Sequence, residues 1–267
     1  MKKLLSFALA AVMVLVCVFS FTSCGKKGKT LDEVKKAGEL VVATSPDFPP
    51  FENLEGGEVV GIEVEILKKV CEKLGVTLNL KQMDFDSVLP GVTAGKFDCG
   101  MSGITVTESR QKNMLFTDPY FVAAQAIVVK AGSSIQSKAD LDGKKVSVQT
   151  GTTAEEYCSE NGYTVSAFAA NSDAETALLN GNVDAWVIDN LVGIAMVAAY
   201  NEGKAESEKL VILSEVMTSE PYAFAFAFGS EDLVAEINKI QKAMIEDGTI
   251  AAIFAQFGED YAAPASK

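Results

Sequence analysis

One arginine stands out in a sequence that is otherwise rich in lysine. Arg110 is the only arginine of the 267-residue chain. A guanidinium group binds a carboxylate through two parallel, charge-assisted hydrogen bonds, a geometry that an ammonium group cannot reproduce. In so lysine-rich a sequence, a single arginine favours a specific anion-binding role over a surface position near the start of a helix. Arg110 is therefore a candidate for holding a small carboxylate.

A later apolar run ends in a hydrogen-bond acceptor, which complements the hydrogen-bond donor Arg110. The segment VDAWVIDN, residues 183–190, is typical of a strand and places Asp189 at its end. A carboxylate there can accept hydrogen bonds from an ammonium group. Asp189 can also cap the helix expected over residues 190–199, and the two roles can coexist. Asp184, at the other end of the strand, is assigned a structural role, and Trp186 is expected in the core.

The stretch ATSPDFPPFE, residues 43–52, follows the first predicted strand. It combines three prolines with two phenylalanines and two acids. Prolines fix a loop at low entropic cost, so the stretch predicts a preorganised loop where a ligand crevice would lie. Phe51 is expected in the core.

A second loop could bind an anion through its backbone. Gly151, Thr152 and Thr153 follow the strand VSVQ and begin a helix, and N–H groups at a helix start form such a site. The glycine pattern is too short for a phosphate-binding P-loop.

Composition excludes several functions. The formal charge is −13, which disfavours nucleic acid as a partner. The absence of histidine removes Ser-His-Asp and Cys-His catalysis and the commonest zinc ligand. Cys71, Cys99 and Cys158 show no metal-ligand spacing and are expected as three buried thiols, with one disulfide plus a free thiol as the alternative. No metal or cofactor is expected.

The N-terminus has the pattern of a processed export segment. Lys2 and Lys3 precede an uncharged apolar run over residues 4–21. The following FTSCG resembles a bacterial lipobox, which predicts a signal peptide over residues 1–23 and lipidation of Cys24. A short polar tether over 24–30 would then hold the folded body near a membrane. A simple cleaved signal peptide is the alternative.

Strand-like and helix-like segments alternate along the rest of the chain, which favours an α/β fold with mainly parallel sheets. Segments with strand character lie at residues 39–45, 77–83, 126–130, 146–149, 164–169 and 183–189. Gly75 is expected to end the first long helix. Asp86 is expected to cap the next helix, and Ser172 with Glu175 to form a capping box. The segment 231–258 predicts two amphipathic helices.

The order of these motifs resembles that of bacterial extracellular solute-binding proteins of family 3, which serve polar amino-acid ABC transporters. The resemblance covers residues 31–258 and is most specific at GITVTESR, residues 103–110. It implies a two-lobe, type II periplasmic-binding-protein fold. Lobe 1 would comprise residues 31–121 and 223–264, and lobe 2 residues 124–220. Two hinge strands are expected near 120–125 and 220–224, with the ligand between the lobes.

The resemblance also implies a role for each site residue. Arg110 would bind the α-carboxylate of an amino acid, helped by Ser102, Gly103, Thr105 and Thr153. Asp189 would bind the α-ammonium group. The side chain would be bound by Ser45, Asp47, Phe48, Phe85 and Gln149. Phe48 and Phe85 can instead be plain core residues.

The implied function is capture of a polar L-amino acid and its delivery to a permease with its ATPase. No lysine or arginine occurs among the side-chain positions, so acidic ligands are disfavoured. The two aromatics and Asp47 favour arginine or lysine, with glutamine or cystine as alternatives. A monomer anchored by lipid on the outer face of the cell membrane is expected. The competing hypotheses are an enzyme on the same fold, such as a cyclohexadienyl dehydratase, with Asp47 or Glu52 as acid, and a ligand sensor that signals through a partner.

Overall fold

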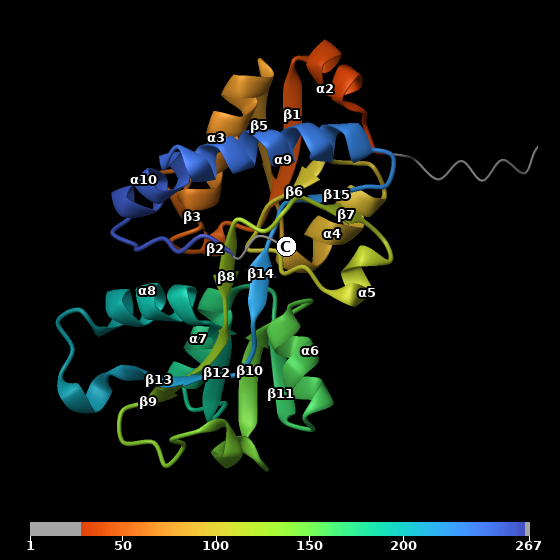
Figure 1. Ribbon diagram of the computed structural model, residues 1–267. Coiled ribbons are helices and arrows are strands. Elements are labelled where there is room, and N and C mark those ends of the chain that lie inside the picture. Colours follow the sequence, from red (N-terminus) through yellow and green to blue (C-terminus); the bar gives the residue numbers. More distant parts are fainter. Residues whose placement is uncertain (1–27, 265–267) are drawn as a thin grey trace, which may run out of the picture.

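The computed structural model describes residues 28–264, so the predicted signal peptide and the lipidation site Cys24 lie outside the described residues. Two α/β units, each built on a five-stranded sheet, lie one above the other (Figure 1). Within residues 28–264, no helix is both long and apolar enough to cross a bilayer.

The first unit is built from both ends of the described chain, and its strand order is β5-β1-β6-β15-β7. Its strands are β1 (Glu39–Thr44), β5 (Thr77–Gln82), β6 (Cys99–Gly100), β7 (Leu115–Phe116) and β15 (Ala225–Phe226). Its helices are α2 (Leu31–Ala37), α3 (Ile62–Leu74), α4 (Phe85–Thr93), α5 (Glu108–Gln111), α9 (Glu231–Glu246) and α10 (Thr249–Gln256). A small antiparallel sheet lies between β1 and α3 in the chain and contains β2 (Asp47–Phe48), β3 (Glu52–Glu55) and β4 (Glu58–Val60).

The second unit is one continuous stretch of chain, with the strand order β11-β10-β12-β9-β13. Its strands are β9 (Gln125–Lys130), β10 (Lys145–Gln149), β11 (Thr164–Phe168), β12 (Ala185–Asp189) and β13 (Leu210–Val216). Its α-helices are α6 (Thr153–Glu160), α7 (Asn171–Leu179) and α8 (Asn190–Asn201), with short 3-10 helices at Lys138–Leu141 and Glu206–Glu208.

Both sheets are mainly parallel, as expected from the sequence, but each contains one reversed strand, β15 in the first and β9 in the second. In the first sheet β1 pairs in parallel with β5 and β6, whereas β15 runs antiparallel to β6 and β7. In the second, β10 pairs in parallel with β11 and β12, whereas β9 runs antiparallel to β12 and β13. The reason is visible at β9: its first residue, Gln125, lies opposite Asp189, the last residue of β12. The chain therefore enters the sheet from the edge where the parallel strands end.

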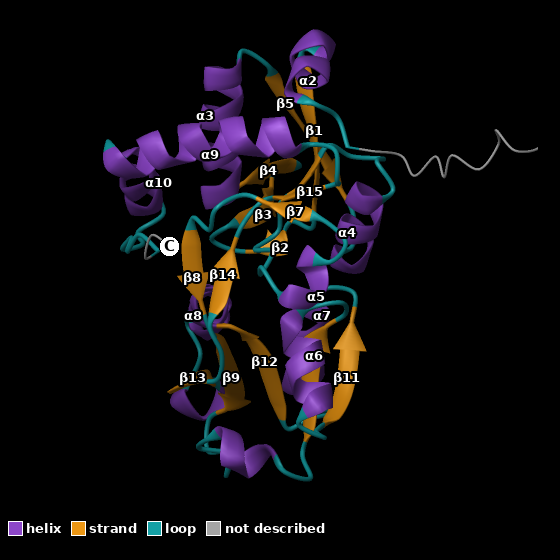
Figure 2. Cartoon of the chain, turned by 45° about the vertical axis from the view of Figure 1, so that its right-hand side comes forward, coloured by secondary structure: helices purple, strands orange, loops and turns teal. Residues whose placement is uncertain are grey.

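Two strands connect the units. β8 (Phe121–Ala123) and β14 (Glu220–Tyr222) pair antiparallel and lie between the two five-stranded sheets (Figures 1 and 2). They fall within the two segments predicted as hinges. The α/β class and the two-unit architecture are confirmed, while the hinge role and the lobe boundaries at 31–121, 124–220 and 223–264 stay predictions.

Helix ends agree with the sequence in part. Gly75 ends α3 with a left-handed φ of 75°, as predicted. Helix α4 begins two residues earlier than expected, so Asp84 rather than Asp86 occupies its N-cap position. Helix α7 also begins early, with Ala170 at its N-cap, and Ser172 is therefore inside the helix and does not cap it. The acceptor that replaces Ser172 comes from the other unit and is described below.

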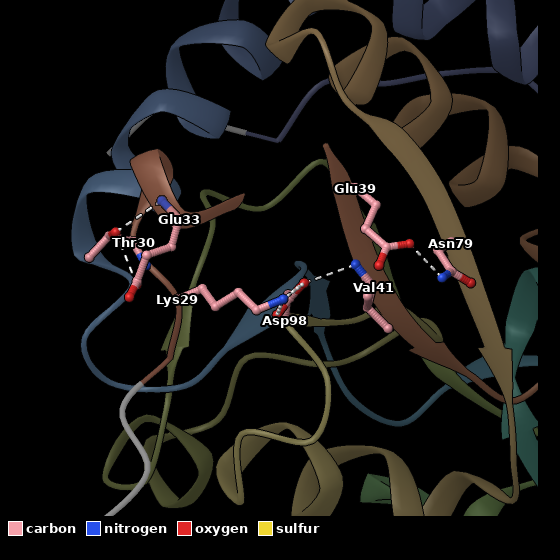
Figure 3. Close-up of polar contacts among 7 residues, drawn as sticks. All are labelled: Lys29, Thr30, Glu33, Glu39, Val41, Asn79 and Asp98. Atoms are coloured by element: carbon pink, nitrogen blue, oxygen red, sulfur yellow. Dashed lines mark hydrogen bonds and ion pairs between the residues drawn. The ribbon is translucent and has the colours of Figure 1, made fainter. Parts of the chain in front are cut away.

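The last residues of the predicted tether are held on the first unit. The amide of Gly28 donates to Phe228 O at 2.8 Å. Lys29 Nζ lies 3.0 Å from Asp98 Oδ1, and Asp98 Oδ2 accepts a hydrogen bond from Val41 N on β1 (Figure 3). Thr30 caps α2 in a capping box with Glu33. Residues 28–30 of the predicted tether are therefore held against the first unit by these contacts.

Apolar side chains fill the space between sheets and helices. Phe51 and Trp186 are fully buried, as predicted for core residues. Cys71, Cys99 and Cys158 are free and buried, which agrees with the interpretation as three thiols. Burial raises the pKa of Cys71 to about 11 and that of Cys158 to about 12, so neither is a ready nucleophile.

Candidate functional site

A cavity lies where the two units meet, and loops at the carboxyl ends of several strands contribute to it. Ser45 follows β1, Gln149 ends β10 and Asp189 ends β12. The lining residues are Ser45, Phe48, Phe85, Ser102, Gly103, Thr105, Arg110, Gln149, Thr152, Thr153 and Asp189. The structure thus brings together every residue predicted for ligand contact except Asp47.

Arg110 spans the boundary between the units. Its Nη1 donates to Thr105 O at 2.9 Å, and its Nη2 donates across the boundary to Gly151 O at 3.2 Å. The guanidinium carbon lies 5.9 Å from the centre of the Phe85 ring. Burial lowers the pKa of Arg110, while nearby Glu220 and other acids oppose that shift. A guanidinium in this position can bind a carboxylate placed in the cavity.

Asp189 presents an unsatisfied acceptor. It occupies the N-cap position of α8, but its side chain makes no capping hydrogen bond. Its buried Oδ1 has no hydrogen-bond partner among residues 28–264. Burial, together with the neighbouring Glu220 carboxylate, raises the pKa of Asp189 to about 7, although Tyr222 and Gln125 oppose the rise. Of the two roles proposed for Asp189, the geometry favours binding of a cationic group over capping.

Three residues beside Asp189 were missed by the sequence analysis. In the part of the chain that the structure describes, Gln125 Oε1, Glu220 Oε2 and the Tyr222 hydroxyl are also buried without a partner. Gln125 Nε2 donates to the cavity-lining Thr153 Oγ1 at 3.3 Å. These residues lie on or beside the connecting strands, so their segments were predicted. Their position beside Asp189 was not predicted, because it depends on the pairing of β8 with β14 and of β9 with β12.

The loop after β6 is shaped by buried contacts. Ser102 Oγ accepts a hydrogen bond from Ser45 N at 3.1 Å and donates to Glu52 Oε1 at 2.8 Å. Gly103 N donates to Glu63 Oε2 at 2.9 Å. Gly103 has φ 53°, and a Cβ there would lie 2.3 Å from Phe48 Cε1. Only glycine fits this position without displacing the Phe48 ring.

The two aromatic residues, Phe48 and Phe85, belong to the core and also border the cavity. Phe48 and Phe85 line the cavity but are only 7% and 6% exposed. The Phe48 ring packs 6.0 Å from the Phe51 ring and 6.2 Å from the Tyr222 ring, centre to centre. They are therefore core residues whose remaining exposed atoms face the cavity.

The structure does not place Asp47 in the cavity. Asp47 Oδ2 instead accepts hydrogen bonds from Ser172 N at 3.1 Å and Ser172 Oγ at 3.4 Å. Asn171 Nδ2 donates to Asp47 O at 3.2 Å and to Gln149 Oε1 at 3.1 Å. The free N–H groups at the start of α7 donate hydrogen bonds to the carboxylate, and this explains why Asp47 lies there and not in the cavity. The expected contact between Asp47 and a ligand side chain is therefore corrected.

The predicted anion site at Gly151–Thr153 is partly occupied by the chain itself. Gly151 N donates to Glu155 Oε2 at 2.6 Å, and Thr152 Oγ1 accepts from Glu155 N at 3.2 Å. Thr152 also lines the cavity, which the sequence analysis did not state. Its place before a helix was the available indication. Residues 28–264 contain no group of His, Cys, Asp and Glu side chains suited to a metal ion.

Comparison with known proteins places this chain among binding proteins. The family model for bacterial extracellular solute-binding proteins, family 3, matches residues 40–260. The arginine-binding extracellular protein ArtP of Bacillus subtilis is 32% identical, over 94% of this chain and 95% of ArtP. A crystal structure of a mutant ArgBP from T. maritima superposes with a TM-score of 0.79 at 37% identity, covering 85% of this chain and 98% of ArgBP.

A third relative connects the fold to enzymes. The ancestral amino acid-binding protein AncCDT-1, a precursor of cyclohexadienyl dehydratase, superposes with a TM-score of 0.78 at 33% identity, covering 86% of this chain and 99% of AncCDT-1. The family match spans both α/β units and the strands between them. The chain therefore belongs to the bacterial extracellular solute-binding proteins of family 3.

Proposed function

We propose that this protein captures a polar L-amino acid in the cavity between its two units and delivers it to the permease of an ABC importer. The observation that carries the proposal is that the side chains of Arg110 and Asp189 line the same cavity. A free amino acid offers one carboxylate for the guanidinium and one ammonium group for the unpaired carboxylate oxygen. Ser102, Gly103, Thr105 and Thr153 would complete the carboxylate end.

Arginine is the first candidate ligand. Among residues 28–264, Arg110 is the only basic residue that lines the cavity, and Asp189 and Glu220 lie beside it. A cationic amino acid would balance these acids, whereas an acidic side chain would be buried without a counter-charge. The faces of Phe48 and Phe85 also suit a guanidinium or ammonium group. ArtP and ArgBP support the same choice, with lysine, glutamine and cystine as the alternatives.

We propose that the protein binds its ligand without converting it to a product. Glu52 and Asp47, the acids considered for catalysis, do not line the cavity. Glu52 lies behind Ser102 and accepts a hydrogen bond from it, and Asp47 accepts a hydrogen bond from the start of α7. Neither carboxyl group is therefore placed to exchange a proton with a ligand. Chromatography after a long incubation tests this directly. Unchanged amino acid supports a binding protein, and a new product would contradict it.

We also propose that the mature protein is a monomer anchored through a lipid on Cys24 at the outer face of the membrane. Two lobes, 31–121 with 223–264 and 124–220, would close around the ligand. Cys24→Ala should release the protein from membranes, whereas continued membrane association would contradict the anchor.

A thermal-shift screen against the proteinogenic amino acids, ornithine and cystine tests the central function. A ligand at about 100 times its dissociation constant adds about 2.7 kcal/mol of stability, which is plain in a melting curve. The largest shift is expected with arginine. A shift with glutamine or cystine alone would keep the function and change the ligand, and no shift at all would contradict the function.

A further inference from the structure

Two glutamates lie directly behind the loop that lines the carboxylate end of the cavity. Glu52 comes from β3 and Glu63 from the first turn of α3, and both side chains are fully buried. Neither belongs to the cavity lining. None of the ion pairs found among residues 28–264 involves either carboxylate. Two buried acids without a basic partner are costly unless at least one is neutral.

The hydrogen bonds distinguish the two acids. Glu63 accepts at both oxygens, from the Tyr120 hydroxyl at Oε1 and from Gly103 N at Oε2. Glu52 accepts from Ser102 Oγ at Oε1, but its buried Oε2 meets no donor in the described part of the chain. A proton on Glu52 Oε2 removes this defect, because a protonated oxygen can donate a hydrogen bond to the neighbouring Glu63 carboxylate.

The electrostatic surroundings agree with this assignment. Burial raises the pKa of Glu52 well above its usual range, and Glu63 raises it further by its charge and by accepting a hydrogen bond from the protonated form. Asp47 acts in the same direction. Tyr120 and Cys99 also adjoin the pair, and burial and the Glu63 charge raise the pKa of both, so they stay neutral.

The pair reaches the cavity through three residues that line it. Glu63 fixes the amide of Gly103, while Glu52 fixes the hydroxyl of Ser102, which in turn accepts from the amide of Ser45. We propose that Glu52 and Glu63 share one proton, carried by Glu52, and act as positioning residues that hold this loop in the geometry that binds the ligand's carboxylate. The effect on binding rests on the proposed function, whereas the shared proton does not.

Infrared spectroscopy of the ligand-free protein tests the shared proton. Burial raises the pKa of Asp189 and of Glu175 to about 7, so both are ionised at about pH 8.5, where the proposal requires Glu52 to keep its proton. The carbonyl band of a protonated carboxyl group is expected at that pH. It should disappear in Glu52→Gln and persist in Glu55→Gln, an exposed control on the same strand. A wild-type spectrum without the band, or one that Glu52→Gln leaves unchanged, would overturn the proposal.

Calorimetric titration with L-arginine tests the positioning role. Glu52→Gln keeps a neutral donor and should bind within about threefold of wild type. Glu63→Gln replaces one acceptor oxygen by an N–H donor, so Gly103 N, the Tyr120 hydroxyl and the Glu52 proton can no longer all find an acceptor, and binding should weaken about tenfold or more. Equal affinity losses in the two variants would overturn the role. If Glu63→Gln does not fold, the infrared result still decides the proton, and if wild type binds no amino acid, only the proposed function fails.

Discussion

The carboxylate of Asp47 caps helix α7 from the opposite side of the cavity, with Ser172 N donating to Asp47 Oδ2 at 3.1 Å. Asp47 belongs to the first unit and Ser172 to the second, so this contact exists only while the units touch. Helix α7 has no side-chain cap of its own. The Asp47–Ser172 contact is therefore suited to stabilise the closed arrangement of the cavity.

Asp47→Ala should weaken the binding of every ligand by the same factor. Loss of an N-cap costs about 0.5–2 kcal/mol, which corresponds to about 2- to 30-fold in affinity if the cap forms only on closure. Asp47→Asn should restore most of the affinity, because its carbonyl oxygen can still accept. Titrations with arginine and glutamine provide the measurement. A loss confined to cationic ligands would show that Asp47 contacts the ligand side chain after all.

Arg110→Ala should abolish measurable binding while the ligand-free protein stays folded. The variant loses the bidentate partner of the ligand carboxylate, and removing one partner of a buried charge pair costs about 2–5 kcal/mol. Arg110→Lys should recover little, since an ammonium cannot form the paired hydrogen bonds. Lys112→Ala, an exposed neighbour, is the control. Calorimetry and a melting curve test the prediction, and retained affinity in Arg110→Ala would contradict the site.

Ligand binding near neutral pH should release a proton from Asp189. Its pKa is raised to about 7 without a ligand, and an ammonium group beside it favours the charged form and lowers that pKa. The affinity should therefore rise about tenfold per pH unit below pH 7 and level off above pH 7. Calorimetry in two buffers of different ionisation enthalpy measures the release. Asp189→Asn should bind weakly and release none, and a pH-independent affinity in wild type would be inconsistent with this role.

Gly103→Ala should impair both stability and binding. A methyl group there would lie 2.3 Å from Phe48 Cε1, so the ring must move into the cavity or away from it. Gly132→Ala is a matched control, because Gly132 also has a left-handed φ, of 78°, but an added Cβ meets nothing within 4 Å. The control should lose about 1–2 kcal/mol of stability with unchanged affinity. Denaturant unfolding and titration compare the two, and similar behaviour would argue against the Phe48 contact.

The sequence predicted the fold class and most of the cavity because both depend on local patterns. Strand ends place Ser45 at the edge of the first sheet and Gln149 and Asp189 at the edge of the second, and the single arginine indicates Arg110. The sequence did not predict relations that depend on pairing between distant segments. Examples are the reversed direction of β9 and the cap that Asp47 gives to α7. Glu52 could not be placed for the same reason, since its burial depends on Glu63 and Ser102 meeting behind the loop.

The central claim is that one cavity binds the α-carboxylate and the α-ammonium group of an amino acid together. The most direct measurement is a calorimetric comparison of L-arginine with agmatine, which lacks only the α-carboxylate. Wild type should bind L-arginine and lose at least about 2 kcal/mol with agmatine, and Arg110→Ala should no longer distinguish the two. If L-arginine proves a poor ligand, the best amino acid and its decarboxylated amine replace the pair. Equal binding of amino acid and amine by wild type would contradict the claim.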